Sequence, residues 1–473
     1  MRRDTVVLLT SLVMVLSLRP SLSPAGGGAV RQGNVLSPGD QLKVDYESGQ
    51  GEHDLPAFRP GEIIVGFDPN VLPAERQRLV QEKGCWIART CDLADFHLVG
   101  VPGSVRPEDM AQLLGQQDGV RYAELNYCVQ AAFTPDDKLY AYQWNLNNPA
   151  QNDIRMQEAW DIEEGDPNVI VAVVDTGVAY EDFDIYRQAP DLADTHFVPG
   201  YDFVNDDNHP NDDHGHGTHV TGTIAQSTNN LIGVAGVAFR CSIMPVKAVD
   251  DDGVGDVFAI SQGILFAVEH GARVINLSVG SLQPSTTLQN AVKTAYDRGV
   301  TVVAAAGNEY AKRNQPSYPA AYTDYCIAVG AVRYDLTRAP YSSTGSYVSL
   351  VAPGGDLTVD QNGDGHPDGI LQQTFKSDPN DFAYWFFQGT SMATPHVTGL
   401  AALLASYGVT SPDKIREAME RTARDLGPAG WDAEYGWGMI DAHAALTYRA
   451  PGDLGSDNGA DRENLAARFA VTP

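Results

Sequence analysis

The stretch GTSMATPHV at positions 389–397 constrains the fold of this chain more than any other. Its Gly-Thr-Ser turn leads directly into an apolar run, which predicts a helix from Met392 to about Ser406. This helix has no clearly polar face, so we expect it to be buried. Pro395 is tolerated in its first turn, where the missing N–H has no partner to lose. The hydroxyl of Ser391 then lies at the N-terminus of a core helix, where backbone N–H groups and the positive end of the helix dipole converge.

A serine in this position has two interpretations. It can serve only as the N-cap of the helix. It can also be a nucleophile, because N–H groups at a helix start would stabilise the oxyanion that nucleophilic attack generates.

Three further segments carry polar residues at the ends of apolar runs. An apolar strand at 169–174 ends in Asp175, and a second at 300–305 is followed closely by Asn308. The segment HGHGTHV contains His214, His216 and His219 at the start of a predicted helix. In an open α/β sheet, functional residues are expected at the carboxyl ends of strands, which is where the acid and the amide fall.

Together with GTSMATPHV, these segments resemble the four signature segments of the subtilisin-like serine proteases (subtilases), in the chain order Asp, His, Ser. The resemblance implies a serine endopeptidase in which Asp175, His216 and Ser391 form the catalytic triad and Asn308 supplies a side-chain oxyanion donor. In such a triad the histidine takes the serine proton and later delivers it to the leaving amine, while the aspartate fixes the histidine tautomer. His214, His219 and His396 are interpreted as structural, and no His-Glu-x-x-His segment supports a zinc site.

The region from residue 133 onward alternates between strands and helices. Such alternation predicts an α/β fold built on a doubly wound parallel sheet with helices on both faces, which agrees with the subtilisin-like fold that the resemblance implies. Strands are predicted at 169–174, 243–249, 274–279, 300–305 and 327–332, with crossover helices at 257–268 and 288–296.

The preceding region has a different order of elements. Strands are predicted at 61–67, 85–90, 95–101 and 120–129, and helices at 73–83 and 106–117. Leu72, Arg76, Leu79 and Val80 are expected on one face of the first helix, and Met110, Leu113 and Leu114 on the inner face of the second. This order is the split-βαβ pattern. A small α+β domain before a subtilase resembles the inhibitory pro-domain of that family, which implies a zymogen; an unrelated accessory domain is the alternative.

Five segments are therefore expected: a signal peptide at 1–25, a flexible linker at 26–58, the pro-domain at 59–132, the protease domain at 133–449 and a disordered tail at 450–473. The uncharged apolar run at 5–18 follows two arginines and is shorter than the ~20 residues that span a bilayer. It fits a secretory signal, which predicts a secreted protein without stable membrane insertion. A retained membrane anchor is the alternative.

The composition limits the classes of molecule that this protein is expected to bind. A net charge of −29 makes nucleic acid an improbable ligand. The five cysteines are few and odd in number, and no Cys-x-x-Cys pair occurs, so neither a zinc site nor a disulfide framework is predicted. We expect a monomer that acts on protein or peptide substrates, with its own pro-domain as inhibitor.

A peptide substrate is expected to add as an extra strand. The resemblance implies that Ser278, Val279, Gly280, Ala305 and Gly307 flank the primary pocket, that Glu309 lies near its base, and that Val257, Ile260 and Val279 line a further apolar pocket. The alternative for the apolar residues is ordinary core packing. We expect broad endopeptidase activity with large apolar or aromatic P1 residues, and Glu309 as a means of admitting basic ones.

Structural calcium is expected at two loops. The first, TNNLIGV at 228–234, resembles the calcium loop of subtilases. Its implied ligands are the side chains of Asp137, Asp184 and Asn230 and the carbonyls of Thr228, Ile232 and Val234. An ordinary surface loop is the alternative.

The second loop, DQNGDGHPD at 360–368, has the spacing of the first part of an EF-hand. Leu371 stands at position 12 in place of the bidentate Glu, so a complete EF-hand is excluded and another group must complete the shell. A solvated Asp/Gly turn is the alternative. Oxygen ligands fall at positions 1, 3, 5 and 9 as Asp360, Asn362, Asp364 and Asp368, with Gly365 at position 6 and the His366 carbonyl at position 7.

Two other functions share this fold. A pseudoprotease would use it for binding, but the complete set of Asp, His, Ser and Asn argues against that reading. A specialised maturation protease would act on one partner substrate, and a cleavage profile on a peptide library would distinguish it from a broad degrader.

Overall fold

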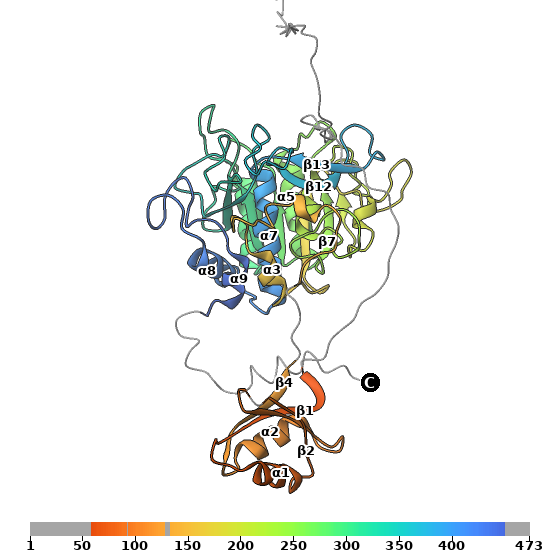
Figure 1. Cartoon of the computed structure of the whole chain (residues 1–473). Coiled ribbons are helices and arrows are strands. Elements are labelled where there is room, and N and C mark those ends of the chain that lie inside the picture. Colours follow the sequence, from red (N-terminus) through yellow and green to blue (C-terminus); the bar gives the residue numbers. More distant parts are fainter. Residues whose placement is uncertain (1–57, 92, 128–132, 450–473) are drawn as a thin grey trace, which may run out of the picture.

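The computed structural model describes residues 58–91, 93–127 and 133–449 (Figure 1). The predicted signal peptide, almost all of the linker, the end of the pro-domain at 128–132 and the predicted tail lie outside the described residues.

The first body is a four-stranded antiparallel sheet with the strand order β2-β3-β1-β4 and two helices. This is the split-βαβ arrangement that the sequence predicts. Its elements are β1 (Phe58–Phe67), α1 (Pro73–Gln81), β2 (Trp86–Cys91), β3 (Phe96–Gly100), α2 (Pro107–Gly115) and β4 (Val120–Tyr127).

Two predictions for the helices of this body are wrong: Leu113 does not point inward, and Leu72 does not lie on a face of the first helix. Leu113 is 41% exposed, because the buried face of α2 runs through Met110, Ala111 and Leu114. That spacing follows the helical repeat, and Leu113 falls beside this face rather than on it. Leu72 is 69% exposed, because it precedes α1 as its N-cap residue.

The second body is built on a seven-stranded sheet with the order β11-β10-β9-β8-β5-β7-β6, in which every neighbouring pair is parallel. From β5 the chain runs to the edge strand β6, returns to β7 beside β5, and then crosses to β8 on the other side of β5, which is the topological switch expected of a doubly wound sheet. The strands are β5 (Ile170–Asp175), β6 (Tyr201–Asp202), β7 (Ser242–Lys247), β8 (Val274–Leu277), β9 (Thr301–Ala305), β10 (Cys326–Val332) and β11 (Leu350–Pro353).

Helices cover both faces of this sheet (Figure 1). Alternate residues of β5 show the two sides, because Val171 and Val173 pack in one core and Ala172 and Val174 in the other. The first core also contains α3 (Met156–Trp160), α4 (His216–Ala225), α7 (Thr390–Ser406), α8 (Pro412–Thr422) and α9 (Ala442–Thr447). The second contains α5 (Val257–Glu269) and α6 (Thr286–Asp297).

The helix that organises the body is α7, which is buried along most of its length and contacts five strands and α4. It begins at Thr390, two residues earlier than the sequence predicts. Pro395 therefore lies beyond the first turn, and the expectation that its missing N–H costs no hydrogen bond is wrong.

A hairpin that the sequence does not predict precedes α7. It pairs β12 (Ile370–Thr374) with β13 (Ala383–Phe387) in antiparallel register. The hairpin packs on α4, where the ring of Phe387 stacks on His219 at a centroid distance of 4.4 Å.

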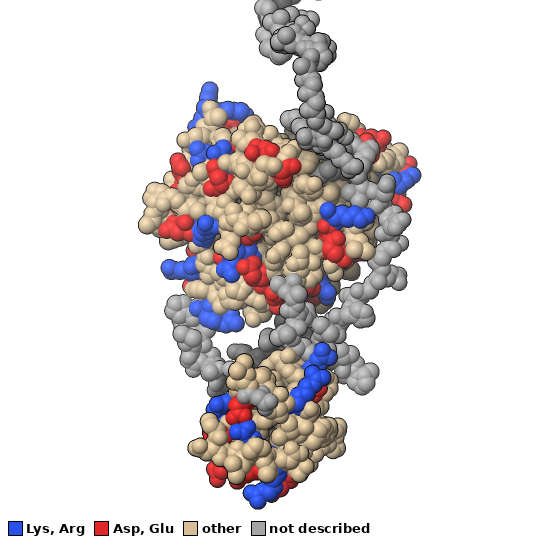
Figure 2. Space-filling view, in the orientation of Figure 1, with Lys and Arg blue, Asp and Glu red and all other residues tan. Residues whose placement is uncertain are grey.

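Neither a membrane-crossing helix nor a disulfide occurs within the described ranges. Cys85, Cys91, Cys241 and Cys326 are free thiols there. Figure 2 shows acidic and basic side chains interspersed over a largely uncharged face of the second body.

Core histidines should make this body sensitive to acid. Burial lowers the pKa of His396 to about 4 and that of His219 to about 3. His396 Nδ1 donates to the Met392 carbonyl and Nε2 accepts from Asn145, so the neutral ring is satisfied on both sides. An unfolded histidine has a pKa near 6.5, so the unfolded chain binds more protons as the pH falls from 6.5 towards 4, and stability falls with it.

We expect His396→Met in an inactive Ser391→Ala chain to lose less thermal stability between pH 7 and pH 4.5 than its parent. The pH-dependent loss removed should be of the order of 2–3 kcal/mol, since one pKa unit is about 1.4 kcal/mol. The measurement is the unfolding midpoint at saturating calcium, with His443→Gln on α9 as the control. Equal losses in parent and variant would show that His396 does not drive acid unfolding.

Candidate active site

Ser391 occupies the first turn of α7, directly after Gly389 and Thr390. The first N–H groups of a helix have no partner within it, so the backbone N–H of Ser391 is available at this end. The missing N–H of Pro395 also leaves the Ser391 carbonyl without its helical partner four residues on. Ser278 donates to that carbonyl through its hydroxyl at 2.9 Å.

The same two residues contact each other a second time. Ser391 Oγ donates to the Ser278 carbonyl at 3.0 Å, rather than to His216. The serine–histidine hydrogen bond that a triad requires is therefore not formed in this state. Such catalytic hydrogen bonds often tighten only when substrate binds, so this geometry does not remove Ser391 from its predicted role.

His216 and Asp175 form a tight pair at the end of the sheet. Asp175 is the last residue of β5 and is fully buried, while His216 is the first residue of α4. His216 Nδ1 lies 2.6 Å from Asp175 Oδ1, which also accepts from the Thr176 N–H at 2.8 Å. With Nδ1 bound to the carboxylate, Nε2 is the nitrogen free to accept a proton.

Opposing influences set the pKa of His216. Burial lowers it, but the charge of Asp175, its hydrogen bond and the charge of Asp212 together raise it above the ordinary histidine value. Protonated His216 is thus more stable than the protonated form of a buried histidine without such neighbours. A general base needs this stability, because it carries a proton for part of the reaction.

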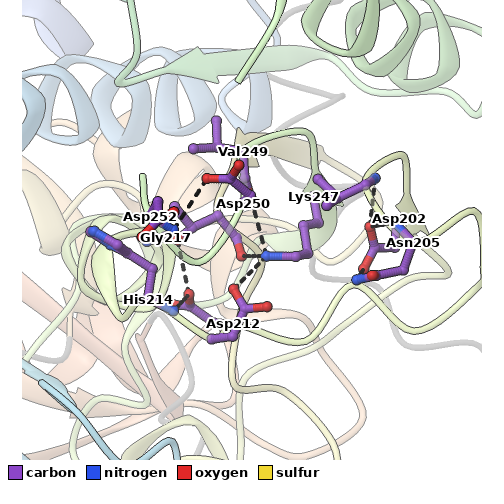
Figure 3. A network of polar contacts seen from close by, with 12 residues as sticks. Asp202, Asn205, Asp212, His214, Gly217, Lys247, Val249, Asp250 and Asp252 are labelled. Carbon is purple, nitrogen blue, oxygen red and sulfur yellow. Dashed lines mark hydrogen bonds and ion pairs between the residues drawn. The ribbon is translucent and has the colours of Figure 1, made fainter. Parts of the chain in front are cut away.

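Asp212 lies beside the start of α4, near His214 and Gly217 (Figure 3). Its Oδ1 accepts from the Thr176 hydroxyl at 2.8 Å, and its Oδ2 accepts from the Thr218 N–H at 2.9 Å and from the Thr218 hydroxyl at 2.6 Å. Thr176 in turn accepts from the Gly217 N–H at 2.9 Å. One carboxylate therefore ties the residue after Asp175 to the residues that follow His216.

Lys247 holds the same segment from the other side (Figure 3). It is completely buried, and its ammonium group donates to the Thr176 carbonyl at 2.8 Å, to Asp213 at 2.6 Å and to the Val249 carbonyl at 3.1 Å. All three of its N–H groups are thereby used. A buried ammonium with such contacts fixes the backbone around Asp175 rather than serving as a titrating base.

Asn308 lies beside the start of α7. Its Oδ1 accepts from the N–H and the hydroxyl of Thr390, each at 3.0 Å, which leaves the amide Nδ2 directed elsewhere. A Cβ atom built on Gly389 would lie 3.6 Å from both Asn308 Nδ2 and the Ser391 nitrogen. The two predicted oxyanion donors therefore face one small space, which the absent side chain of Gly389 leaves open.

A cavity of about 620 Å³ extends from the Asp175–His216 pair. Five of the predicted substrate-binding residues line it: Val257, Ile260, Ser278, Val279 and Gly280. The other three do not. Ala305 is buried in β9, the Gly307 N–H donates to the Thr390 hydroxyl, and Glu309 forms an ion pair with Lys312 at 3.0 Å.

The first predicted calcium loop contains two buried carboxylates, but one is not the residue expected. Asp137 Oδ2 accepts from the Asn229 N–H at 2.9 Å. Asp191, not Asp184, is the second acid: its Oδ1 accepts from the Asn230 amide at 2.9 Å and its Oδ2 from the Val234 N–H at 3.1 Å. Asp184 lies on an exposed turn, where its carbonyl accepts from Arg187.

These carboxylates need a counter-charge. Burial raises the pKa of Asp137 to about 6 and that of Asp191 well above its ordinary value. Within the described ranges neither forms an ion pair with Lys or Arg. Oxygen-only surroundings of this kind fit Ca²⁺, with Thr228, Asn230, Ile232 and Val234 on the same loop.

In the second predicted calcium loop, four side chains shape the turn instead of pointing to one centre. No group of three or more His, Cys, Asp or Glu side chains in the described part of the chain is already arranged to hold a metal ion. Asp360, Asn362, Asp364 and Asp368 each accept from backbone N–H groups inside the loop, and the His366 ring packs near Tyr142 and Phe386.

Sequence reasoning missed several residues that hold this site. Asp212 and Lys247 were not singled out, although one lies four residues before His216 and the other is a lone lysine ending an apolar strand. Thr390 was part of the quoted motif but had no role assigned. A buried charge inside an apolar run is the signal that could have drawn attention to Lys247.

The comparisons agree with this geometry. Residues 166–438 match the model of the subtilase family, and residues 46–126 match the fervidolysin N-terminal prodomain. A thermophilic serine proteinase of Bacillus sp. (strain AK1) is 37% identical over 442 residues, which is 93% of this chain and 98% of that protein. Thermitase of Thermoactinomyces vulgaris is 37% identical over 316 residues, 67% of this chain and all of that protein.

A solved structure also matches. It is described as proteases from Pseudoalteromonas arctica PAMC 21717 and aligns with a TM-score of 0.58 at 32% identity, covering 66% of this chain and 99% of that one. Fold, motif order and relatives thus lead to one assignment: this chain belongs to the subtilase family of subtilisin-like serine peptidases and carries an N-terminal prodomain.

Proposed function

We propose that this protein is a secreted serine endopeptidase that cleaves peptide bonds with Asp175, His216 and Ser391 and is made as a self-processed zymogen. The observation that carries the proposal is the 2.6 Å contact between His216 Nδ1 and the buried Asp175 carboxylate, with Ser391 at the start of α7. It frees Nε2 to take the serine proton once substrate displaces the Ser391–Ser278 hydrogen bond.

The chemical steps follow from these positions. Ser391 Oγ attacks the scissile carbonyl as His216 removes its proton. The negative oxygen that forms is stabilised by the Ser391 N–H and the Asn308 amide, which face the space beside Gly389. His216 then returns the proton to the leaving amine, and water repeats the sequence to release the acyl group.

The cavity supports a preference for apolar side chains. Val257, Ile260 and Val279 line it close to the Asp175–His216 pair. Glu309 is already paired with Lys312, which weakens the case that it selects basic residues. The three apolar residues were expected to line the further apolar pocket, so they support an apolar preference there. Broad specificity with large apolar P1 residues stays part of the proposal.

Secretion is supported by related proteins. Relatives with 32% identity include a halolysin-like extracellular serine protease of Natrialba magadii and a minor extracellular protease of Bacillus subtilis. The predicted signal at 1–25 is consistent with this. We further propose a monomer that uses its pro-domain as inhibitor and binds structural calcium through Asp137 and Asp191, whose burial without a basic partner favours a cation.

Self-processing provides the main test. Wild type expressed alone should yield a product beginning between about residue 130 and residue 138, whereas Ser391→Ala should keep its pro-domain, because the nucleophile for the cut is missing. N-terminal sequencing reads the result. Adding wild-type enzyme to the mutant checks that its processing site is intact. Normal self-processing by purified Ser391→Ala would exclude Ser391 as the nucleophile.

Asn308 should act mainly on kcat. Asn308→Ala and Asn308→Asp are each expected to lower kcat by roughly 10²–10³ with little change in KM, a range carried over from a subtilisin rather than derived for this chain. The Asp variant keeps an oxygen for Thr390 but loses the N–H donor. If Asn308→Asp retains full kcat, the amide is not an oxyanion donor.

Asp212 should shift the pH profile. Activity requires neutral His216, so kcat/KM rises as the pH increases through the raised pKa of that histidine. Removing the negative charge in Asp212→Asn lowers that pKa, and the acidic limb should move to lower pH even if kcat falls. Asp206→Asn, in the same acidic stretch but exposed, is the control. An unmoved limb in a folded variant would mean that Asp212 acts only through the backbone.

A further inference from the structure

We propose that residues 360–368 form a second calcium site, which is anchored by buried Asp368 and fixes the β12–β13 hairpin against α4. The proposal concerns the loop directly before β12, and it does not depend on the catalytic assignment. It rests on one buried oxygen, on the chemistry of the loop and on the contacts that the hairpin makes.

The loop is already folded as a tight turn. Asp360 Oδ1 accepts from the Gly363 N–H at 2.7 Å, and its Oδ2 accepts from the Gly365 N–H at 3.1 Å. Asp364 Oδ1 accepts from the His366 N–H at 2.8 Å. A carboxylate oxygen has two lone pairs, so these contacts leave capacity for a cation.

Asp368 supplies the observation that points to a ligand. It is 1% exposed, and its Oδ2 accepts from the Gln361 N–H at 2.6 Å, so the carboxylate is directed into the loop. Its Oδ1 is buried and has no hydrogen-bond partner. Nearby Arg333 pairs with Asp335 and Asp356 instead. A buried carboxylate oxygen without a donor or a counter-charge is costly, and a bound cation would remove that cost.

The donor set selects calcium among common cations. The side chains offer only carboxylate and amide oxygens, from Asp360, Asn362, Asp364 and Asp368. The one nitrogen ligand nearby, the His366 ring, packs with Tyr142 and Phe386 at centroid distances of 5.0 and 5.6 Å. Flexible, oxygen-only coordination suits Ca²⁺, whereas Mg²⁺ demands near-ideal octahedral geometry.

Binding requires a modest rearrangement. Asp360 and Asp364 are exposed, so they can turn toward the fixed Asp368 by exchanging their hydrogen bonds within the loop for the cation. This also explains why the loop carboxylates are not gathered round one point here. Asp368 at position 9 takes over as the anchor, because Leu371 cannot act as the bidentate ligand at position 12.

A metal ion at Asp368 would also affect β12, because Asp368 lies two residues before that strand. The first residue of that strand, Ile370, contacts His219 Nε2 through its carbonyl at 3.0 Å. The last, Thr374, donates to the Gly215 carbonyl at 2.5 Å, directly before His216. A metal that fixes Asp368 therefore fixes the strand that supports the start of α4.

The test uses the full chain in the Ser391→Ala form, which prevents self-digestion. Bound calcium is counted by equilibrium dialysis against Ca²⁺ at fixed free concentration, for the parent and for the added changes Asp364→Asn and Asp360→Asn/Asp364→Asn. Both positions are exposed, so folding should be retained. Asp378→Asn changes an exposed acid between β12 and β13, outside the loop, and is the matched control.

We expect the double variant to bind one calcium ion fewer than its parent, or to bind that ion at least about tenfold more weakly. The reason is that calcium affinity falls when charged ligands are removed. Limited proteolysis should then cut faster between residues 363 and 369, and Asp378→Asn should match the parent in both measurements. Equal calcium stoichiometry, equal affinity and equal cutting in the double variant would overturn the proposal. The first calcium loop is unchanged in every chain, so its ion is counted equally throughout.

Discussion

The burial of α7 on one face of the parallel sheet is the constraint on which the rest of this body depends. The helix contacts β5, β8, β9, β10 and β11 together with α4, α8 and α9. Because it is apolar on all sides, it cannot rotate or shift without exposing core residues. Its N-terminus is therefore a fixed point, and Asn308, Ser278 and His216 are arranged around it by the ends of other core elements.

The same burial explains why polar contacts surround the charged groups beside His216. Asp175 has no exposed surface, yet it must remain an acceptor for an imidazole. The chain surrounds it with backbone and side-chain contacts: the Thr176 N–H reaches Asp175 itself, while Asp212 and Lys247 hold the flanking backbone. Buried ionic groups of this kind are better understood as fixing one geometry than as adding stability.

The sequence was most informative where local pattern and burial coincide. Apolar strands such as β5 and β10 were predicted within a residue or two, because fully buried parallel strands appear as continuous apolar runs. Asp175 and Asn308 were predicted at strand ends for the same reason. The hairpin β12–β13 was missed because its polar residues, such as Gln372 and Gln373, are buried by tertiary contacts that no local pattern reveals. Asp191 was missed because only the folded chain shows which acid lies beside the loop at 228–234.

Pro395 ties two distant positions together. Because Pro395 has no N–H, the Ser391 carbonyl lacks the hydrogen bond that a helix normally provides. The hydroxyl of Ser278, which follows β8, donates to this carbonyl instead. A residue with an N–H at position 395 would satisfy the carbonyl from within the helix, and the hydroxyl at 278 would then lose this role. Replacing Pro395 would therefore remove one of the two hydrogen bonds that hold the segment after β8 to Ser391, and would leave only the bond from Ser391 Oγ to the Ser278 carbonyl.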